Sequence, residues 1–516
     1  MSFVAMTPFL HRSFLILGFV GYVVDAINAA TVHVVGATAF VRQDDAARIH
    51  RRTDDIATPA HAPLHLTTDV SMRDKVVATM EWAWKGYREH AFGSDSLDVQ
   101  SMGAAIGSHD LAVSLVDSLD TLYLMGLMDE FNEAAAWAET NMLAKHAASG
   151  SVSLFETTIR VLGGYLAAYS LSGRPGLLAL ADDLGARLSR PFNQSPFPRF
   201  QVDLETGASF GASSLAEFTT IQLEFKYLAR VTGKTTYADA VESIMDKVVQ
   251  NVQSSYPDGL VPVSADNEAG SFKPGRISLG ACGDSYYEYL LKQWLLSGKR
   301  DTKYRDIYVT AVDSINRKLV ARSAKSNWAF LGDLNDAGQL DPVMDHLVCF
   351  VPGMLALGYI NGMPLWHLDL AKELLHTCFE ACHTSKLAPE RISFNINAAD
   401  APDMQIYPLD SFNILRPETV ESLMLLYRVT GDPTYREWGN IILDAFERNC
   451  KLPEGGYSSV NHVDTTTPTK GFRPEMESFF MAETLKYFYL LYSDETVVPL
   501  DKFVFNTEAH PFPIDT

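Results

Sequence analysis

Helical spacing of apolar residues dominates the chain from about Met72 onward. Between Lys75 and Glu89, apolar side chains recur at mixed spacings of three and four residues, and the stretch from Leu215 to Val231 repeats this pattern. Such spacing places apolar side chains on one face of an α-helix. Alternating patterns, which would indicate strands, are few and short. The chain is therefore predicted to be all-α, with only short strands.

A recurrent junction separates the predicted helices. An apolar helix ends at a glycine, a short polar link follows, and a second amphipathic helix begins, as expected for a helix C-cap followed by a new helix start. The junctions lie at 124–126, 171–173, 231–233, 296–298, 360–362 and 429–431, with a version without glycine at 492–493. Their spacing of about 60 to 70 residues corresponds to two helices with their connections. The pattern predicts seven helical hairpins.

Seven hairpins can build either an open solenoid or a closed toroid. The loops between the predicted helices differ strongly, and several are long and rich in Asp, Glu, Gly and Pro. Variable loops gathered at one end of a closed ring would form a pocket. We therefore favour an α/α toroid.

The first 30 residues have the composition of a signal peptide or a signal anchor. An apolar run from Phe14 to Val24 follows a weakly basic start, and Asp25 interrupts it. The run is shorter than the ~20 residues of a membrane-spanning helix. Small residues after it suit a signal peptidase, so we favour a cleaved signal peptide over an N-terminal membrane anchor.

Residues 31–70 show no sustained period and are expected to form a stem, followed by a body of residues 71–516. With either a signal peptide or an anchor at 1–30, the body lies in the secretory pathway, secreted or in the ER or Golgi lumen. Disulfides persist in these compartments.

The formal charge of the chain is −21, from 42 Lys and Arg against 63 Asp and Glu, and no basic run occurs. A phosphate backbone would be repelled, which excludes nucleic acid as a partner. The five cysteines include no CxxC pair, so a structural zinc site is not expected.

Four acidic residues stand out because a carboxylate in an apolar setting is costly without a function or a partner. Glu156 follows Leu-Phe, with Arg160 one helical turn later. Two interpretations stay open: a general acid with a raised pKa, or a surface i,i+4 ion pair. Asp284 opens a predicted helix, where an N-cap alone would explain it. Pro417 is expected at the first position of another helix, with Glu418 just inside it, where the helix dipole would keep a general base ionised. Favourable helix-end electrostatics alone would also explain Glu418.

Glu390, the fourth of these acids, is a loop carboxylate after a helix. Glu477 and Glu483 add two more acids at a helix entry. The polar cluster 504–511 offers oxygen ligands that suit Ca²⁺ better than Zn²⁺, although a C-terminal loop with a capping Asn explains it too. Each acid lies near a helix start, and a toroid would bring those starts to one end. Two carboxylates facing a sugar ring are the equipment for glycoside hydrolysis.

Eight ordered motifs resemble the class I α-mannosidases, glycoside hydrolase family 47, from about residue 87 to 514. They contain Asp117 and Asp120, Glu156 to Arg160, Glu217, Asp284 to Lys292, Asp345 to Cys349, Arg416 to Glu421, Glu477 to Lys486 and Asn506 to Pro511. The resemblance implies an (α/α)7 barrel. It also implies an inverting exo-hydrolase, expected to be a monomer, that removes terminal α-1,2-linked mannose from high-mannose N-glycans with one Ca²⁺.

The resemblance assigns roles position by position. Glu156 matches the general acid and Glu418 the base that activates water. Asp284 and Glu390 match the other two catalytic acids, and Asp284 is a rival candidate for the base. Thr507 matches the direct protein ligand of Ca²⁺.

Seven further residues match positions that contact the sugar or hold water on the metal. Glu421, Glu483 and Glu508 match the acids that hold the waters, and the others match positions that line the −1 pocket: Arg160, His346, Arg416 and Phe479. Cys349 and Cys378 match the disulfide of the family.

Two positions bear on which substrate is preferred. The Asp-Glu-Leu-x-Pro segment of the family reads Asp95-Ser-Leu-Asp-Val99 here, which puts local substrate contacts in doubt. Cys282 lies where a bulky or basic residue can restrict which mannose branch enters. Its small side chain favours trimming of several branches, as in Golgi or secreted fungal relatives, over single-linkage ER trimming.

Two other functions compete with the processing hydrolase. A lectin-like quality-control relative, which binds or trims glycans of misfolded glycoproteins for degradation, usually lacks the disulfide pair, so Cys349 and Cys378 favour the processing hydrolase. An α/α-toroid isoprenoid enzyme would use an Asp-rich metal motif, of which Asp182-Asp183 is a fragment. A solvated helix face explains that pair better.

Overall fold

The computed structural model describes residues 64–105, 110–382, 386–464 and 474–516. The predicted signal segment, and the stem up to residue 63, lie outside the described residues. No helix within the described ranges is long and apolar enough to cross a membrane. The first helix of the described residues, α2 (Val70–His90), begins one residue before the predicted start of the body at residue 71.

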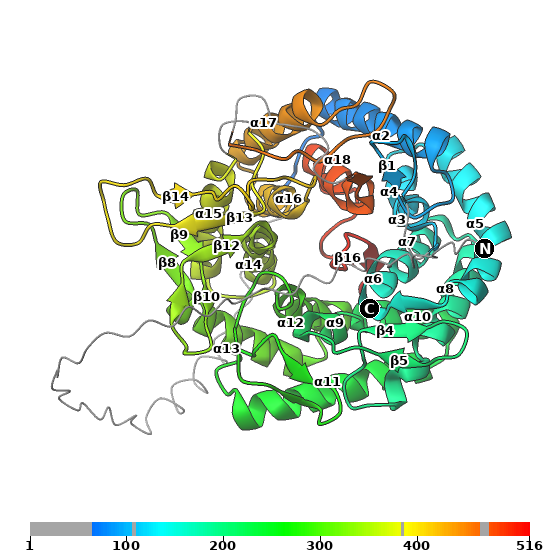
Figure 1. Cartoon of the computed structure of the whole chain (residues 1–516), viewed down its shortest axis with the longest axis horizontal. Helices are drawn as coiled ribbons and strands as arrows, with labels where there is room; N and C mark the ends of the chain where they lie inside the picture. The colour runs from blue at the N-terminus through cyan, green and yellow to red at the C-terminus, as the bar shows by residue number, and fades with distance from the viewer. Residues whose placement is uncertain (1–63, 106–109, 383–385, 465–473) are drawn as a thin grey trace, which may run out of the picture. The chain divides into compact units, whose positions relative to one another are not determined.

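Seven packed helix pairs form a ring (Figure 1). An inner helix and an outer helix make up each pair, and neighbouring inner helices contact each other around the ring. The inner helices are α4 (Leu119–Leu124), α7 (Gly163–Ser172), α10 (Gln222–Thr232), α12 (Asp284–Leu296), α14 (Val351–Ile360), α16 (Glu418–Thr430) and α18 (Leu485–Tyr492). Their outer partners are, in the same order, α5 (Met128–Ala148), α8 (Pro175–Leu188), α11 (Thr236–Ser255), α13 (Thr302–Lys318), α15 (Leu365–Glu380), α17 (Thr434–Asn449) and α2. This confirms the predicted all-α class and the (α/α)7 barrel.

The two rings differ in how their helices are buried. The inner helix α12 is buried at every position from Ser285 to Leu296, as is α18 over its whole length. The outer helix α11 buries one face, through Val241, Ile244 and Val248 among others, and exposes the rest. A helix that is apolar all round belongs in a core, whereas an amphipathic helix covers one.

The predicted junctions coincide with real helix ends. At 173, the glycine has a φ of +69° and its N–H donates to the carbonyl of Tyr169, which closes α7. The other five junction glycines also have positive φ values. This left-handed conformation carries a steric penalty for residues with a Cβ, so glycine fits there.

The junction at 492–493 differs from the prediction. No second helix follows it within the described residues; α18 instead pairs with α2, the first helix of the body. The Asp69 N–H donates to the carbonyl of Tyr492 at 2.8 Å, which fastens the start of α2 to the end of α18. The seventh hairpin is therefore assembled from the two ends of the body, and it closes the toroid.

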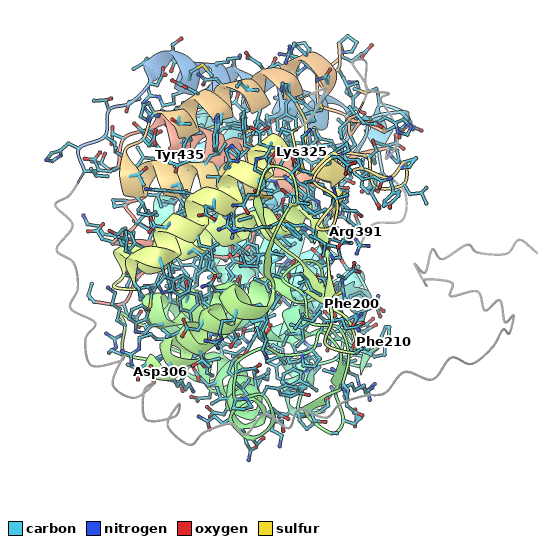
Figure 2. All side chains as sticks on the ribbon, turned by 90° about the vertical axis from the view of Figure 1, so that its left-hand side faces the viewer. Phe200, Phe210, Asp306, Lys325, Arg391 and Tyr435 are labelled. Carbon is cyan, nitrogen blue, oxygen red and sulfur yellow. A yellow bond between two sulfur atoms is a disulfide. The ribbon has the colours of Figure 1, made fainter. Side chains whose placement is uncertain are left out.

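Connections gather at the two ends of the ring. Figure 2 shows Phe200, Phe210 and Arg391, which precede inner helices, towards one end, and Asp306 and Tyr435, near the starts of outer helices, towards the other. The first end holds short sheets, including β3 (Ser151–Ser153), β4 (Gln201–Asp203) and β5 (Ser209–Phe210), and β12 (Val343–Asp345), β13 (Arg391–Phe394) and β14 (Met404–Gln405). Nine further described strands have two or three residues each: β1 (Leu97–Asp98), β2 (Gly103–Ala104), β6 (Ala265–Asp266), β7 (Ser271–Phe272), β8 (Val320–Arg322), β9 (Ala329–Leu331), β10 (Asp333–Leu334), β11 (Leu340–Asp341) and β15 (Glu475–Met476).

A C-terminal hairpin enters the ring. Strands β16 (Phe503–Phe505) and β17 (Pro511–Pro513) pair antiparallel, and β16 lies inside the ring in Figure 1. The hairpin tip, residues 506–510, packs closely on α7: a Cβ on Gly163 would lie 2.8 Å from the His510 ring. The hairpin thus brings the C-terminal polar cluster into contact with the inner helices.

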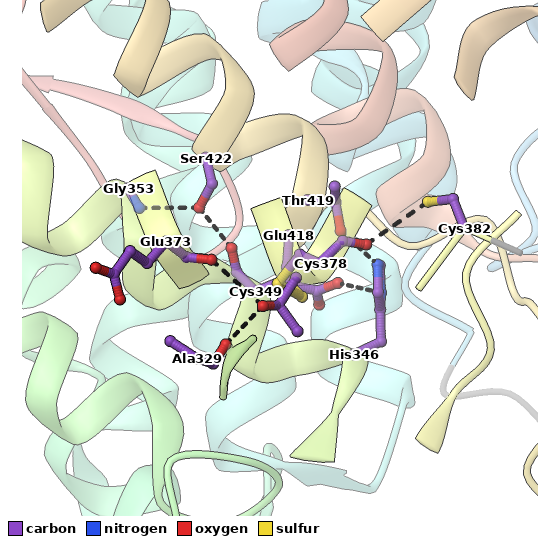
Figure 3. Close-up of a disulfide and its surroundings, with 11 residues drawn as sticks. Ala329, His346, Cys349, Gly353, Glu373, Cys378, Cys382, Glu418, Thr419 and Ser422 are labelled. Carbon is purple, nitrogen blue, oxygen red and sulfur yellow. Dashed lines mark hydrogen bonds and ion pairs between the residues drawn. A yellow bond between two sulfur atoms is a disulfide. The ribbon is translucent and has the colours of Figure 1, made fainter. Parts of the chain in front are cut away.

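The predicted disulfide is present. Cys349, in the short helix His346–Phe350, is bonded to Cys378 of α15 (Figure 3). By the chain-entropy model, closing a loop of this size stabilises the fold by about 3 to 4 kcal/mol. The bond ties an outer helix to the segment that carries His346.

Candidate active site

A cavity of about 310 Å³ opens into the ring among the starts of the inner helices and the hairpin tip. All but two of the predicted site residues line it: Glu156, Arg160, Asp284, Arg416, Glu418, Glu421, Phe479, Glu483, Thr507 and Glu508. The toroid therefore brings together acids that lie up to 352 positions apart in the chain, Glu156 and Glu508. The predicted gathering of helix starts at one end agrees with this cavity.

The two exceptions, His346 and Glu390, are not among the residues that line the cavity, but each contacts one that is. The Nδ1 atom of His346 is 3.1 Å from Oε2 of Glu418, and its Nε2 atom is 2.8 Å from the Thr419 hydroxyl (Figure 3). Glu390 accepts two hydrogen bonds from the Arg416 guanidinium, one of them at 2.7 Å. His346 is thus placed to orient Glu418, and Glu390 to orient Arg416.

Glu156 ends the short helix α6 (Leu154–Glu156), just before a π-helical turn, Thr157–Leu162. Arg160 in that turn donates to Glu156 at 2.8 Å and also to Glu508 of the hairpin tip. The ion-pair interpretation of Glu156 and Arg160 is therefore right about the contact. The pair lies in the cavity, however, and joins α6 to the hairpin tip.

Asp284 is the first residue of α12, and Gly283 occupies the N-cap position. The Asp284 carboxylate accepts from the N–H of Ser285, one residue on, which is not the capping geometry. The N-cap interpretation is therefore wrong. Burial, together with the charges of Glu288 and Glu418, raises the pKa of Asp284 to about 7.

Glu418 is the first residue of α16, and Pro417 is its N-cap, one position earlier than predicted. Burial alone would raise the pKa of Glu418. The neighbouring His346 ring and the Arg416 guanidinium outweigh burial and hold that pKa below its usual range. Two carboxylates of one cavity thus have pKa values that move in opposite directions, so Glu418 is ionised under mildly acidic conditions in which Asp284 is still largely protonated.

The cavity floor is formed by Thr507 and four buried acids: Glu288, Glu421, Glu483 and Glu508. Burial and the like charges of Glu288 and Glu418 raise the pKa of Glu421 to about 8, although Lys292 opposes this shift. Burial also raises the pKa values of Glu483 and Glu508 well above their usual range. The floor carries more carboxylates than nearby cations can neutralise.

A Ca²⁺ ion fits the chemistry of this floor. The Thr507 hydroxyl donates to Glu288 at 2.9 Å, which leaves its oxygen lone pairs free to bind a cation. Surrounding donors are all oxygens, as hard cations require. Within the described ranges, no three His, Cys, Asp or Glu side chains are arranged as a direct metal cage. The residues therefore fit an ion held by Thr507, with the carboxylates acting through water.

Phe479 is one of the apolar residues of the wall and lies just before a second π-helical turn, Phe480–Thr484. The guanidinium carbons of Arg160 and Arg416 lie 5.6 and 6.0 Å from the centre of its ring. π-helical turns occur frequently at functional sites, and both of those described here adjoin the cavity.

Sequence reasoning gave no role to two acids of the cavity, Glu288 and Glu217. Glu288 lies four residues after Asp284 on α12, so helical spacing alone places both on one face. Glu217 forms a capping box with Ser214, and burial raises its pKa. Its local capping pattern gave no indication that it also faces the cavity.

The isoprenoid-enzyme alternative finds no support in the structure. Asp183 pairs with the buried His146 and with Arg187, and Asp182 pairs with Lys234. These carboxylates belong to α8, an outer helix, and they are neutralised by protein cations. They do not line the cavity.

Comparison with known proteins agrees with the geometry. A solved α-1,2-mannosidase from Trichoderma reesei superposes with a TM-score of 0.80 at 28% identity, covering 87% of this chain and all of that one. Among curated proteins, the chain is 44% identical over 469 residues to the human endoplasmic reticulum mannosyl-oligosaccharide 1,2-alpha-mannosidase. That match covers 88% of this chain and 65% of the human protein.

The Arabidopsis thaliana mannosyl-oligosaccharide 1,2-alpha-mannosidase MNS3 is 40% identical, over 86% of this chain and 79% of that protein. The family model described as glycosyl hydrolase family 47 matches residues 79–514, which contain the whole ring except the first turns of α2. The chain belongs to glycosyl hydrolase family 47.

Proposed function

We propose that this protein is a Ca²⁺-dependent, inverting exo-glycosidase that hydrolyses terminal α-1,2-linked mannose from high-mannose N-glycans. The observation that carries the proposal is one cavity holding Glu156, Asp284 and Glu418, in which the pKa of Glu418 is lowered and that of Asp284 is raised. Family membership and the activities for which the relatives are named support the substrate class.

In this mechanism Glu418 acts as the general base. His346 and Arg416 keep its carboxylate ionised, so it can take a proton from a water molecule as that water attacks the anomeric carbon. Asp284, with a pKa of about 7, is largely protonated in mildly acidic conditions and is then a poorer base. This difference favours Glu418 over Asp284.

Glu156 acts as the general acid and protonates the oxygen of the leaving sugar. The water attacks the anomeric carbon from the face opposite the breaking bond, so the configuration at that carbon inverts. Arg160 holds Glu156 against the hairpin tip, and the Phe479 ring offers an apolar surface to the sugar. Thr507 would hold Ca²⁺, which would supply positive charge to orient the hydroxyls of the mannose.

The substrate range is proposed to include several mannose branches, because Cys282 lines the cavity with a small side chain. The relatives include both ER and type IB mannosidases, so similarity alone does not select one range. We further propose that the body works as a monomer in the lumen of the secretory pathway, delivered by the 1–30 segment as signal peptide or anchor.

The lectin-like alternative would keep the fold and the sugar contacts but lose turnover. The Cys349–Cys378 bond and the complete set of cavity acids favour the hydrolase.

Incubation of the purified protein with a nine-mannose N-glycan, with and without EDTA, followed by mass analysis, tests the proposal. We expect loss of three or four mannoses, abolished by EDTA and restored by Ca²⁺. Loss of a single mannose would overturn the broad branch range. Binding without any release would favour the lectin-like function, and release that is insensitive to EDTA would remove the metal from the mechanism.

A further inference from the structure

Beneath the hairpin tip lies a second cluster of charge that does not line the cavity. We call it the buried quartet: Asp117, Asp120, Lys486 and His510. All four side chains have no exposed surface. They come from the segment before α4, from α4 itself, from α18 and from the hairpin tip. The quartet therefore joins the first and the last inner helix of the ring.

The contacts of the quartet form a chain. The His510 ring lies between the two aspartates, with Nε2 3.1 Å from Asp117 Oδ1 and Nδ1 3.2 Å from Asp120 Oδ2. Lys486 Nζ lies 2.6 Å from the same Asp120 oxygen. The two carboxylates raise the pKa of His510 despite its burial, and Lys486 and His510 together lower the pKa of Asp120. The four groups carry two negative charges and, with His510 protonated, two positive ones, and Asp117 also lies 3.8 Å from Arg160 of the cavity.

Lys486 also contacts the hairpin backbone. Its ammonium donates to the carbonyl of Ala509 at 2.8 Å, and Ala509 has a φ of +61°, a left-handed conformation that is costly for a residue with a Cβ. Such strain persists only where the surroundings hold it. Asn506 fixes the other side of the tip, because its side-chain oxygen accepts from the N–H groups of Glu508 and His510.

Thr507 and Glu508 lie between these fixed points and face the cavity. We infer that Lys486 and His510 are positioning residues, which set the place of the Thr507–Glu508 backbone in the cavity floor. The inference rests on the proposed function, since it gives the quartet the task of presenting a Ca²⁺ ligand. A buried ion cluster is a poor source of stability compared with apolar packing, so a positioning task accounts better for its presence.

The test must separate loss of position from loss of stability. Lys486→Met removes the bond to Ala509 but leaves a buried negative charge in excess. The double variant Asp120→Asn/Lys486→Met restores the balance, because Asp117 and His510 remain as a pair, while the bond to Ala509 stays lost. Asp183→Asn, which breaks the pair with the buried His146 on outer helices, is the matched control.

Calorimetric titration of the metal-free proteins with Ca²⁺, well below their melting temperatures, gives the readout. We expect about 10- to 100-fold weaker Ca²⁺ binding in the double variant, the usual effect of losing an outer-shell partner of a metal site. Asp183→Asn should bind Ca²⁺ as the wild type does. The KM for a nine-mannose glycan should rise with the Ca²⁺ dissociation constant in the double variant.

A folded double variant whose Ca²⁺ affinity and KM stay within about twofold of the wild type would overturn the inference and leave the proposed function standing. A wild-type protein that neither binds Ca²⁺ nor releases mannose would overturn the proposed function, and this inference with it.

Discussion

Two buried clusters of charge share the hairpin tip 506–510, and they are built in opposite ways. In the quartet, Asp117 and Asp120 face Lys486 and His510, and the charges balance. In the cavity floor, Glu288, Glu421, Glu483 and Glu508 have Lys292 and Arg160 as their cationic neighbours. The pKa of Asp120 accordingly falls, whereas that of Glu421 rises to about 8.

The difference separates a supporting cluster from a reacting one. Balanced charges hold each other in place and need nothing from outside the protein. An excess of buried carboxylates is costly in the empty protein, and it becomes favourable when a cation binds or when positive charge develops on a sugar. The floor therefore lowers the stability of the metal-free protein, whereas the quartet has a net charge close to zero.

The largest expected effect comes from Glu418, whose charge is compensated by His346 and Arg416. Glu418→Gln keeps the shape of the side chain but cannot accept a proton from water. We expect kcat to fall about 10²- to 10⁴-fold with little change in glycan binding, as for loss of a general base. Glu454→Gln, an exposed substitution, is the control. An unchanged kcat would exclude Glu418 as the base.

Removing one excess charge from the floor should make the two clusters more alike. The pKa of Glu421 is about 8 in the folded protein. Between the pKa of the unfolded chain and pH 8, Glu421 therefore takes up a proton on folding, and this uptake lowers the free energy of unfolding. Glu421→Gln should therefore stabilise the metal-free protein at pH 7, by up to about 3 kcal/mol from the linkage relation. It should also weaken Ca²⁺ binding. Urea unfolding in EDTA measures the first effect, and a destabilised variant would contradict the excess-charge account.

Glu224 tests whether burial alone, outside both clusters, shifts stability with pH. Burial raises its pKa to about 7, while Tyr289 and Asn506 donate to it. Between the unfolded and folded pKa values the folded state binds more protons, so stability should fall as pH rises. Glu224→Gln should remove about 2 kcal/mol of that decline between pH 5 and 7. Parallel urea-unfolding series for wild type and variant at several pH values would reveal it; identical slopes would argue against the raised pKa.

The smallest effect concerns His346, which helps to keep Glu418 ionised. His346→Gln should raise the pKa of Glu418, because an opposite charge next to a carboxylate lowers its pKa. Since the base works only when ionised, the acid limb of the kcat/KM profile should move to higher pH, by about one unit. His376→Gln, on an outer helix, should leave the profile in place. An acid limb that does not move would show that His346 does not lower the pKa of Glu418.

The fold was predictable wherever the evidence was local. Helix ends marked by glycine, as at Gly173, can be recognised within a few residues because the left-handed conformation favours glycine. The closing pair of α18 with α2 was not predictable in this way, because its partners lie at opposite ends of the body and no local pattern joins them.

The same limit applies to the site. Glu418 and Thr507 were recognised from helix-start chemistry and family resemblance, and both line the cavity. Glu390 was predicted as a loop carboxylate and matched a catalytic acid, but it contacts Arg416 instead of lining the cavity, a distinction that depends on the paths of β12 and β13. The quartet was missed because its balance appears only when segments 366 positions apart, those of Asp120 and Lys486, meet.

The central claim is that the carboxylates of this cavity hydrolyse an α-1,2-mannoside with inversion. Proton NMR during digestion of a nine-mannose N-glycan in the presence of Ca²⁺ tests it most directly, because the anomer first released can be seen before mutarotation. The account predicts that β-mannose appears first. Initial release of α-mannose, or no release of mannose at all, would contradict it.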